Sequence, residues 1–344
     1  MQTITPEQAL ALVKQHWQLE GSAKELPSYA DRNFQIASAR GKYVFKIANP
    51  GWSYDDLDIE NAALLHLAKT CPDLALPKVK LAGDGRHIIP FFKDKGELCH
   101  MRLLSFVEGE VYAHIAVRSD IDQSKLQHSL GVAVAKIDRG LADFVHTSAD
   151  RYVDWSISNL PDLKHEIEMI EDADLRALVA RHSTFYTAHE AKWRQSLPMQ
   201  VIHNDANDFN AIVASNATEN KSSAQVNAII DFGDMCRSFR IVDLAIGMTY
   251  ALQYVAEDGA VLECAMAILS GYQETTPLTQ AELEVLYHFI MARLCQSILM
   301  ASKASRRHPD NAYIMISQKQ VRRLIQQLDA MPYLSIQQHF LSVL

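Results

Sequence analysis

The segments VIHNDANDFNAIV (201–213) and IIDFGDM (229–235) decide how this chain is interpreted. Apolar, strand-like runs occur in and beside them, at 211–213 and 226–230. Polar residues stand at the ends of these runs, where strands place side chains at an edge. In the order H-x-D-x₄-N and then D-F-G, they are His203, Asp205, Asn210 and Asp231.

The stretch between the two segments predicts the tip of a β-hairpin. Residues 214–225 read ASNATENKSSAQ, which is polar and rich in turn formers. A hairpin with this tip brings Asn210 and Asp231 to one end, although they are 21 positions apart (231 − 210). The two residues can then share one site.

These residue types suit phosphoryl transfer. The carboxylate of Asp205 can accept a hydrogen bond from an alcohol and orient its oxygen toward a γ-phosphate. The oxygens of Asn210 and Asp231 suit a hard cation such as Mg²⁺. Kinase-type phosphotransferases present a base and two metal ligands in this order. A metallohydrolase with His203, Asp205 and Asp231 as ligands is an alternative, but the sequence offers no second histidine cluster nearby.

Length and composition indicate a globular protein with two lobes. The chain has 344 residues, 48% of them hydrophobic and 22% charged, and single cores stop growing at about 250–300 residues. The formal net charge of −8 argues against a nucleic-acid partner, which normally needs a basic face. A cationic substrate is compatible with this charge.

Cysteine usage and hydropathy indicate the compartment. Five scattered cysteines never occur in C-x-x-C spacing, so buried thiols in a reducing compartment are expected. The start, MQTITPEQALAL, has no basic region before an apolar core, and no apolar run approaches a membrane span of about 20 residues. A cytoplasmic protein without a membrane partner is therefore predicted; the oligomeric state stays open.

The N-terminal part is predicted to be rich in strands. A first helix begins at Thr5 as N-cap, with Pro6 at its first position and Gln8 completing a capping box. Strands and one prominent helix follow, with strands expected at 34–37, 42–47, 87–92 and 98–106 and the helix at 55–69.

Beyond residues 107–110 the pattern becomes helical. Apolar residues recur at three- and four-residue spacing over 126–144, which marks an amphipathic helix. Further helices are expected at 161–171, 173–195, 240–255, 260–273, 279–305 and 312–328. The fold class predicted is α+β, with a β-rich lobe over 1–106, a mainly helical lobe over 107–344 and a hinge near 104–110.

Candidate nucleotide-binding residues lie in the first lobe. Lys46, on the strand KYVFKI, could hold α- and β-phosphates, with Glu60 on the next helix holding the lysine in place. Asp58 is the rival partner, because the helix register is not fixed by sequence. The loop LPSYADRNF contains Ser28 and Asn33 but no glycine, so its backbone amides would have to cradle phosphate without one.

Taken together, these motifs resemble the aminoglycoside phosphotransferase/choline kinase superfamily, and within it the hydroxylysine kinases and their bacterial relatives. The segments that carry the resemblance include KYVFKIANP, RLLSFVEGEVYA, LGVAVAKIDRGLADF, HNDANDFN and IIDFGDMCRSFRIVDLAI. The resemblance implies a protein-kinase-like bilobal fold, ATP or GTP as co-substrate and Mg²⁺ as cofactor.

The resemblance also implies a role for each site residue. Asp205 would be the catalytic base, Asn210 and Asp231 the magnesium ligands, and Lys46 and Glu60 would act at the phosphates. His203 would brace the catalytic loop, Asp243 would support it through backbone hydrogen bonds, and the backbone of Ser105–Val107 would meet the purine. The chain departs from the family at Asn204, where relatives often have glycine; asparagine tolerates unusual turn geometry.

The acceptor is predicted by class only. Relatives phosphorylate hydroxyls on small amine-bearing molecules, so the expected partner is an amine-bearing alcohol similar to hydroxylysine, homoserine or an amino alcohol. Candidate substrate residues are Asn207, Asp208, Asp234 and Trp155, since carboxylates and an aromatic face suit an ammonium group. Trp155 is equally typical of a core residue. Arg240 could bind a substrate carboxylate, but a structural role at a helix end is favoured.

Three other functions remain as alternatives. A protein Ser/Thr kinase lacks support, because no APE-like activation segment follows Asp234. A nucleotide-binding pseudokinase regulator is disfavoured, because every metal-site residue is present. A drug-resistance phosphotransferase would need a larger acidic pocket.

Overall fold

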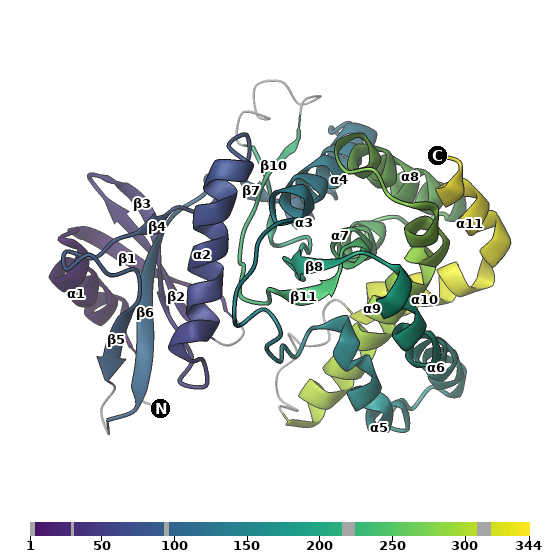
Figure 1. Ribbon diagram of the computed structural model, residues 1–344, viewed down its shortest axis with the longest axis horizontal. Helices are drawn as coiled ribbons and strands as arrows, with labels where there is room; N and C mark the ends of the chain where they lie inside the picture. The colour runs from purple at the N-terminus through teal and green to yellow at the C-terminus, as the bar shows by residue number, and fades with distance from the viewer. Residues whose placement is uncertain (1–3, 29–30, 93–95, 215–223, 308–317) are drawn as a thin grey trace. The chain divides into compact units, whose positions relative to one another are not determined.

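The computed structural model describes residues 4–28, 31–92, 96–214, 224–307 and 318–344 (Figure 1). The chain divides into two compact units. Unit 1 comprises residues 1–108 with 146–148, and unit 2 comprises residues 109–145 with 149–344.

Unit 1 is built on an antiparallel sheet that lies between two helices, α1 and α2 (Figure 1). The strand order is β1 (Gly21–Leu26), β2 (Arg32–Ser38), β3 (Gly41–Ile47), β6 (Leu98–Ser105) and β4 (Val79–Lys80), with β5 (Ile89–Phe92) also paired to β6. The helices are α1 (Pro6–Trp17) and α2 (Tyr54–Thr70). The strands bury Phe34, Phe45 and Met101 against Trp17 of α1.

The register of this sheet places three polar residues in one row. Asn33 on β2 lies opposite Lys46 on β3, and Lys46 lies opposite Arg102 on β6. Because directly opposite residues point to the same face, these side chains belong together. The sheet therefore positions a polar row that the separate strand segments do not reveal.

The predicted helix start at Thr5 is confirmed. The Gln8 backbone N–H donates to Thr5 Oγ1 over 3.3 Å, and the Thr5 N–H donates to Gln8 Oε1 over 2.9 Å. This reciprocal pair satisfies two N–H groups that have no partner inside the helix.

Unit 2 is mainly helical and is organised around α9. That helix contacts α6, α7, α10 and α11, while α4 packs along α8. By length and composition α9 could cross a membrane, but 78% of its most apolar window is buried, as in a core helix. The helices are α3 (Tyr112–Ile115), α4 (Gln123–Gly140), α5 (Lys164–Ile167), α6 (Ala173–Ser196), α7 (Ile241–Leu252), α8 (Asp258–Thr275), α9 (Gln280–Arg307), α10 (Gln318–Ala330) and α11 (Tyr333–Leu341).

Two small sheets in unit 2 carry the motif segments. β9 (Ala211–Val213) pairs antiparallel with β10 (Val226–Ile229) and with β7 (Glu110–Val111), which confirms the predicted hairpin. Most of its expected tip, 215–223, lies outside the described residues. β8 (Met199–Ile202) pairs with β11 (Cys236–Phe239), so that Ile202 is opposite Cys236. This pairing brings the residues after β8 close to the residues before β11.

Several sequence predictions differ from the structure. The helix expected over 161–171 is instead a 3₁₀ helix, Ile157–Leu163, followed by the short α5. Pro161 lacks an N–H donor, which explains why a regular α-helix does not form there. The helix expected over 312–328 begins outside the described residues and is seen as α10. The exposed strand β1 was not predicted, because GSAKEL shows little apolar alternation. All five cysteines are free and buried, as expected.

Candidate active site

The catalytic loop of unit 2 begins where β8 ends and is held by a buried carboxylate. Asp243 on α7 accepts the backbone N–H of His203 at 2.7 Å and that of Asn204 at 2.6 Å. Asn204 has a φ of 65°, in the left-handed region. Asparagine is one of the few residues with a side chain that enter this region readily. The predicted backbone support by Asp243 is confirmed.

The His203 ring links the two motif segments. Its Nδ1 accepts the Asp205 backbone N–H at 3.2 Å, and its Nε2 contacts the Ile230 carbonyl oxygen at 3.1 Å. Accepting at Nδ1 leaves Nε2 as the protonated nitrogen that donates to Ile230. The ring also packs edge-on against Phe232 of the D-F-G segment at 4.5 Å. His203 therefore braces the loop instead of facing a substrate.

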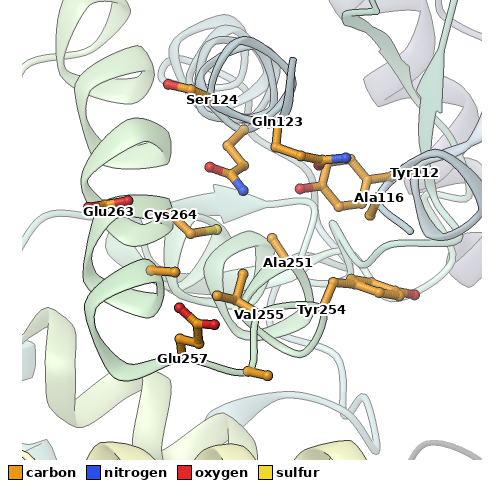
Figure 2. Close-up of a pocket in the computed structure, with 13 residues that line it drawn as sticks. Tyr112, Ala116, Gln123, Ser124, Ala251, Tyr254, Val255, Glu257, Glu263 and Cys264 are labelled. Carbon is orange, nitrogen blue, oxygen red and sulfur yellow. The ribbon is translucent and has the colours of Figure 1, made fainter. Parts of the chain in front are cut away.

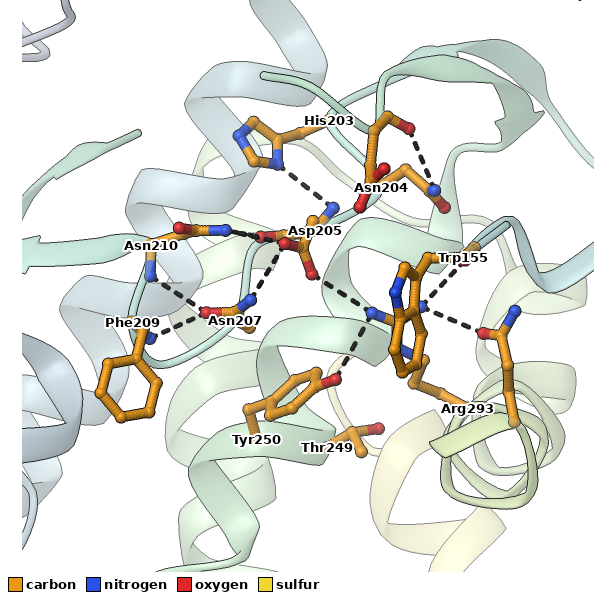
Figure 3. Close-up of polar contacts among 12 residues, drawn as sticks. Trp155, His203, Asn204, Asp205, Asn207, Phe209, Asn210, Thr249, Tyr250 and Arg293 are labelled. Atoms are coloured by element: carbon orange, nitrogen blue, oxygen red, sulfur yellow. Dashed lines mark hydrogen bonds and ion pairs between the residues drawn. The ribbon is translucent and has the colours of Figure 1, made fainter. Parts of the chain in front are cut away.

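Asp205 stands at the centre of a hydrogen-bond network (Figure 3). Its Oδ2 accepts the side-chain amides of Asn207 at 3.0 Å and Asn210 at 2.8 Å. Its Oδ1 faces Arg293 at 3.2 Å, and 21% of the Asp205 side chain remains exposed. Burial and the charge of Asp234 raise the pKa of Asp205 to about 8, and Arg293 opposes that shift.

Arg293 on α9 was not among the predicted site residues. Only 1% of it is exposed, and its guanidinium lies 4.9 Å from the Trp155 ring and 5.6 Å from the Tyr250 ring. Its Nη1 donates to the Trp155 carbonyl at 2.9 Å and to Gln296 Oε1 at 3.0 Å. The sequence signal was an arginine inside the apolar helical run FIMARLC, where a charge needs a buried partner.

This arrangement changes the interpretation of Trp155. Its ring was expected either to bind a substrate ammonium or to belong to the core. In the structure the cation beside the ring is the chain's own Arg293 (Figure 3). One ring face of Trp155 is therefore used inside the protein, and this residue is a weaker candidate for substrate binding than the loop carboxylates.

The candidate metal ligands follow the loop. The side-chain nitrogen of Asn210 donates to the carbonyl and to Oδ2 of Asp205, which leaves its oxygen as the atom suited to a cation. Asp231 is exposed and has a φ of 63°, a backbone conformation that clusters at functional sites. Within the described ranges, no group of three or more His, Cys, Asp or Glu could hold a metal ion. One carboxylate and one amide oxygen still fit Mg²⁺, which takes its other ligands from water and phosphate.

The remaining loop carboxylate is tied to a neighbouring pocket. Asp208 Oδ2 accepts a hydrogen bond from the Tyr254 hydroxyl, and burial raises the pKa of Asp208. Tyr254 lines a cavity of about 590 Å³ (Figure 2). Other lining residues come from α3, α4, α7 and α8 and include Tyr112, Gln123, Glu257 and Glu263. The cavity walls combine aromatic, neutral polar and acidic side chains with small apolar ones such as Ala251 and Val255.

Arg240 takes the structural role that was favoured. Its Nε and Nη2 donate to the two carboxylate oxygens of Glu282 at 2.9 and 2.6 Å. Glu282, at the start of α9, is fully buried. The bidentate carboxylate partner of Arg240 is therefore part of the chain and not a substrate.

Beneath the loop lies a second buried carboxyl group. Asp138 on α4 is fully buried, and its Oδ2 accepts the Tyr272 hydroxyl at 2.6 Å. Burial and the charge of neighbouring Asp243 raise the pKa of Asp138 well above its usual range. A protonated Asp138 has a proton that it can donate toward Asp243, and burial raises the pKa of Asp243 as well.

In unit 1, Glu60, the predicted partner of Lys46, has a second basic neighbour, and the pair of Lys46 and Glu60 stays a prediction. Glu60 forms its ion pair with the fully buried Arg102, which also contacts Asn61 Oδ1 at 3.5 Å. Arg102 lies opposite Lys46 on the neighbouring strand, β6, and from there it reaches the carboxylate of Glu60. The rival Asp58 instead faces His146 at 3.3 Å. Sequence reasoning missed Arg102, whose signal was an arginine in the apolar strand MRLLSF.

Of the other predicted nucleotide residues, Asn33 belongs to the polar row of the sheet, and Ser28, Ser105 and Val107 lie elsewhere in unit 1. Asn33 is buried, and its Oδ1 has no hydrogen-bond partner among the described residues. Ser28 is exposed in the glycine-poor loop. The Ser105 hydroxyl accepts the Lys78 N–H at 2.8 Å, and Val107 follows in the partly exposed connection after β6.

Comparison with known proteins identifies similar chains. The family model described as "Phosphotransferase enzyme family" (APH) matches residues 22–280. Hydroxylysine kinase of Mus musculus is 26% identical over 344 residues, covering 94% of this chain and 89% of that protein. Homoserine kinase of Xanthobacter autotrophicus is 24% identical over 257 residues, covering 73% of this chain and 70% of that protein. Among solved structures, the microcompartment-associated aminopropanol kinase has a TM-score of 0.70 at 16% identity, covering 96% of both chains. The predicted α+β, kinase-like fold is confirmed by this likeness.

Proposed function

This chain belongs to the phosphotransferase enzyme family, and we propose that it transfers the γ-phosphate of ATP or GTP to a small amine-bearing alcohol. The observation that carries the proposal is the position of Asp205. Two amides occupy one of its carboxylate oxygens, a buried arginine faces the other, and part of the side chain is accessible. A carboxylate fixed in this way can orient a hydroxyl.

In the proposed mechanism, Asp205 accepts a hydrogen bond from the acceptor hydroxyl and takes its proton as phosphoryl transfer proceeds. Asn210 and Asp231 would hold Mg²⁺ through their side-chain oxygens. When bound, Mg²⁺ supplies charge neutralisation at the phosphate oxygens. His203 and Asp243 keep the loop in shape, so the position of Asp205 is set before the substrate arrives.

For the nucleotide, we propose the polar row of unit 1. Lys46 would contact the phosphates, and Glu60 would act beside it while bound to Arg102. Asn33 and the loop containing Ser28 would contribute polar groups at the phosphates. The backbone of Ser105–Val107 would meet the purine. Under this proposal residues 1–106 form the nucleotide-binding lobe, and residues 107–344 carry the catalytic hairpin and the acceptor-binding residues.

For the acceptor, the similar proteins and the local charge favour an amine. The curated relatives are named for kinases of hydroxylysine and homoserine, which are both hydroxy amino acids. In this chain Asp208 and Asp234 supply carboxylates close to Asp205, and Asn207 supplies an amide in the same loop. Carboxylates beside the base would attract an ammonium group and exclude anionic alcohols.

The test is Mg²⁺-dependent nucleotide consumption, measured with ATP and GTP separately. The acceptor panel holds 5-hydroxylysine, homoserine, ethanolamine, choline and kanamycin, and Asp205→Asn is the matched variant. We expect turnover with a hydroxylated amine and a loss of about 10²-fold or more in kcat for Asp205→Asn. Undiminished turnover in the variant would remove Asp205 from its role. Nucleotide binding without turnover on any acceptor would favour a nucleotide-binding pseudokinase regulator. Phosphorylation of protein substrates alone would favour a protein Ser/Thr kinase.

A further inference from the structure

We propose that Arg293 is a positioning residue that holds Oδ1 of Asp205 in the orientation needed for phosphoryl transfer. The inference rests on the proposed function, because it assigns a role through the catalytic carboxylate. Arg293 lies on α9, 88 positions from Asp205 in the sequence, and its Nη2 is 3.2 Å from Oδ1.

The two oxygens of Asp205 have different surroundings. Oδ2 accepts amides from Asn207 and Asn210, two residues of the same loop. Oδ1 has Arg293 as its partner, which comes from a different element. The two loop amides fix Oδ2 in place. They do not fix Oδ1, which could still move if the carboxylate group rotated. Since Oδ1 is the oxygen with fewer partners, it is the one free to accept the acceptor hydroxyl, and Arg293 sets its direction.

The guanidinium is itself held by two aromatic rings and by hydrogen bonds at both of its terminal nitrogens. It lies 4.9 Å from the centre of the Trp155 ring and 5.6 Å from that of the Tyr250 ring, and its Nη2 donates to the Tyr250 hydroxyl at 3.4 Å. Its Nη1 is fixed by the Trp155 carbonyl and by Gln296, and Gln296 is fixed in turn by the Ser156 carbonyl at 2.9 Å. A flat cation that packs on an aromatic ring and donates hydrogen bonds from both terminal nitrogens keeps one plane and one orientation. Arg293 therefore transmits the position of α9 and of the 155–156 segment to Asp205.

Other arginines of unit 2 have partners away from the catalytic loop. Arg240 pairs with Glu282 at the start of α9, and the half-buried Arg323 donates to the carbonyls of Gln253 and Val255 at 2.7 and 2.9 Å. Arg293 instead donates from Nη2 to Asp205 and to the Tyr250 hydroxyl. Its Nε has no hydrogen-bond partner within the described residues, and the same holds for Nε of Arg323, so it is the contacts of the terminal nitrogens that distinguish the two arginines. The ion pair with Asp205 is what its placement achieves.

The experiment compares Arg293→Ala, Arg293→Lys and the control Arg323→Ala, with 5-hydroxylysine and Mg-ATP as substrates. We expect Arg293→Ala to lower kcat about 10²-fold, as expected when a reacting group is misplaced, while KM for both substrates changes less than about threefold. Arg293→Lys should recover part of kcat by restoring the charge without the planar fork. Arg323→Ala should lower the melting temperature and leave kcat unchanged.

Chemical rescue gives a readout that a folding defect does not produce. Arg293→Ala leaves an empty space beside the Trp155 and Tyr250 rings, and added guanidinium at millimolar concentration should raise kcat there, whereas ammonium should not. In an Asp205→Asn background, loss of Arg293 should have no further effect on residual turnover, because both changes act through one carboxylate. The proposal would be overturned if Arg293→Ala changed KM as much as kcat. It would also be overturned if guanidinium did not raise the kcat of a folded Arg293→Ala variant. If the wild type itself has no turnover, the proposed function fails instead.

Discussion

At the scale of single residues, the site depends on two backbone conformations that most side chains avoid. Asn204 and Asp231 have φ values of 65° and 63° and stand in the two motif segments. At Asn204 this conformation directs two successive N–H groups toward Asp243. Asparagine takes the place of the glycine common in the resembling family, and its side chain adds a bond to the Asp234 carbonyl at 3.1 Å.

Substitutions at Asn204 should separate these two contributions. Asn204→Gly keeps the backbone conformation and loses the bond to Asp234, so we expect a loss of about 1 kcal/mol in stability and little change in kcat. Asn204→Val forces a β-branched residue into the left-handed region, which costs about 1–3 kcal/mol and should lower kcat. Gln18→Val is the control, because Gln18 has a φ of 52° at the end of α1. It should lower the melting temperature without changing kcat, and a normal kcat in Asn204→Val would contradict this account.

At the scale of elements, the catalytic loop rests on helices that pack unusually closely. A Cβ on Gly131 of α4 would lie 1.9 Å from the Ile268 carbonyl oxygen of α8. A Cβ on Gly271 of α8 would lie 2.0 Å from the His128 carbonyl oxygen of α4. The two glycines let the helix backbones touch at both points. This contact fixes the helix that carries Asp138 beneath the loop.

Gly131→Ala should therefore be costly for a change of one methyl group. The methyl would meet backbone atoms, which cannot move aside as a side chain can, so we expect a loss of about 3 kcal/mol or more. Gly259→Ala on α8 is the matched control, because a Cβ there meets nothing within 4 Å. That change should stabilise by up to about 1 kcal/mol through helix propensity. Urea unfolding of both variants measures the difference, and equal effects would show that the helices are not in close contact.

At the scale of the whole molecule, the chain buries acidic groups that influence its stability as pH changes. Asp138 is fully buried beside Asp243 and Tyr272, and burial raises its pKa well above the ordinary range of an aspartate. The unfolded chain releases this proton near pH 4, but the folded chain retains it. Stability from this group is therefore complete below about pH 4 and is lost as pH rises toward the folded pKa.

Asp138→Asn should remove this dependence. The amide keeps an oxygen for Tyr272 and an N–H for Asp243, but has no proton to release. The free energy of unfolding of the wild type, relative to that of Asp138→Asn, should fall by about 1.4 kcal/mol per pH unit. This fall is expected between the pKa of Asp138 in the unfolded chain and its pKa in the folded chain. Urea unfolding at several pH values from 4 to 9 measures this slope. Parallel curves for the two proteins would mean that Asp138 is not protonated in the fold.

The sequence by itself determined the order of the active-site residues and the elements that carry them. His203, Asp205, Asn210 and Asp231 lie on a hairpin and a loop whose partners are near in the chain, so local apolar runs and turn residues predict them. A β-rich lobe followed by a helical lobe was predicted from the same periodicities, and the kinase-like fold was predicted from the family resemblance. Local pattern also predicted the helix start at Thr5.

Only the tertiary structure decided which distant residues complete the site. Arg293 and Asp138 come from helices, and Arg102 from a strand, each inside an apolar run that predicts burial but names no partner. Glu60 pairs with Arg102 because the register between β3 and β6 places Arg102 opposite Lys46. The sequence of either strand does not reveal this register. A buried charge must find a partner, but which one it finds depends on the packing of elements that are far apart in sequence.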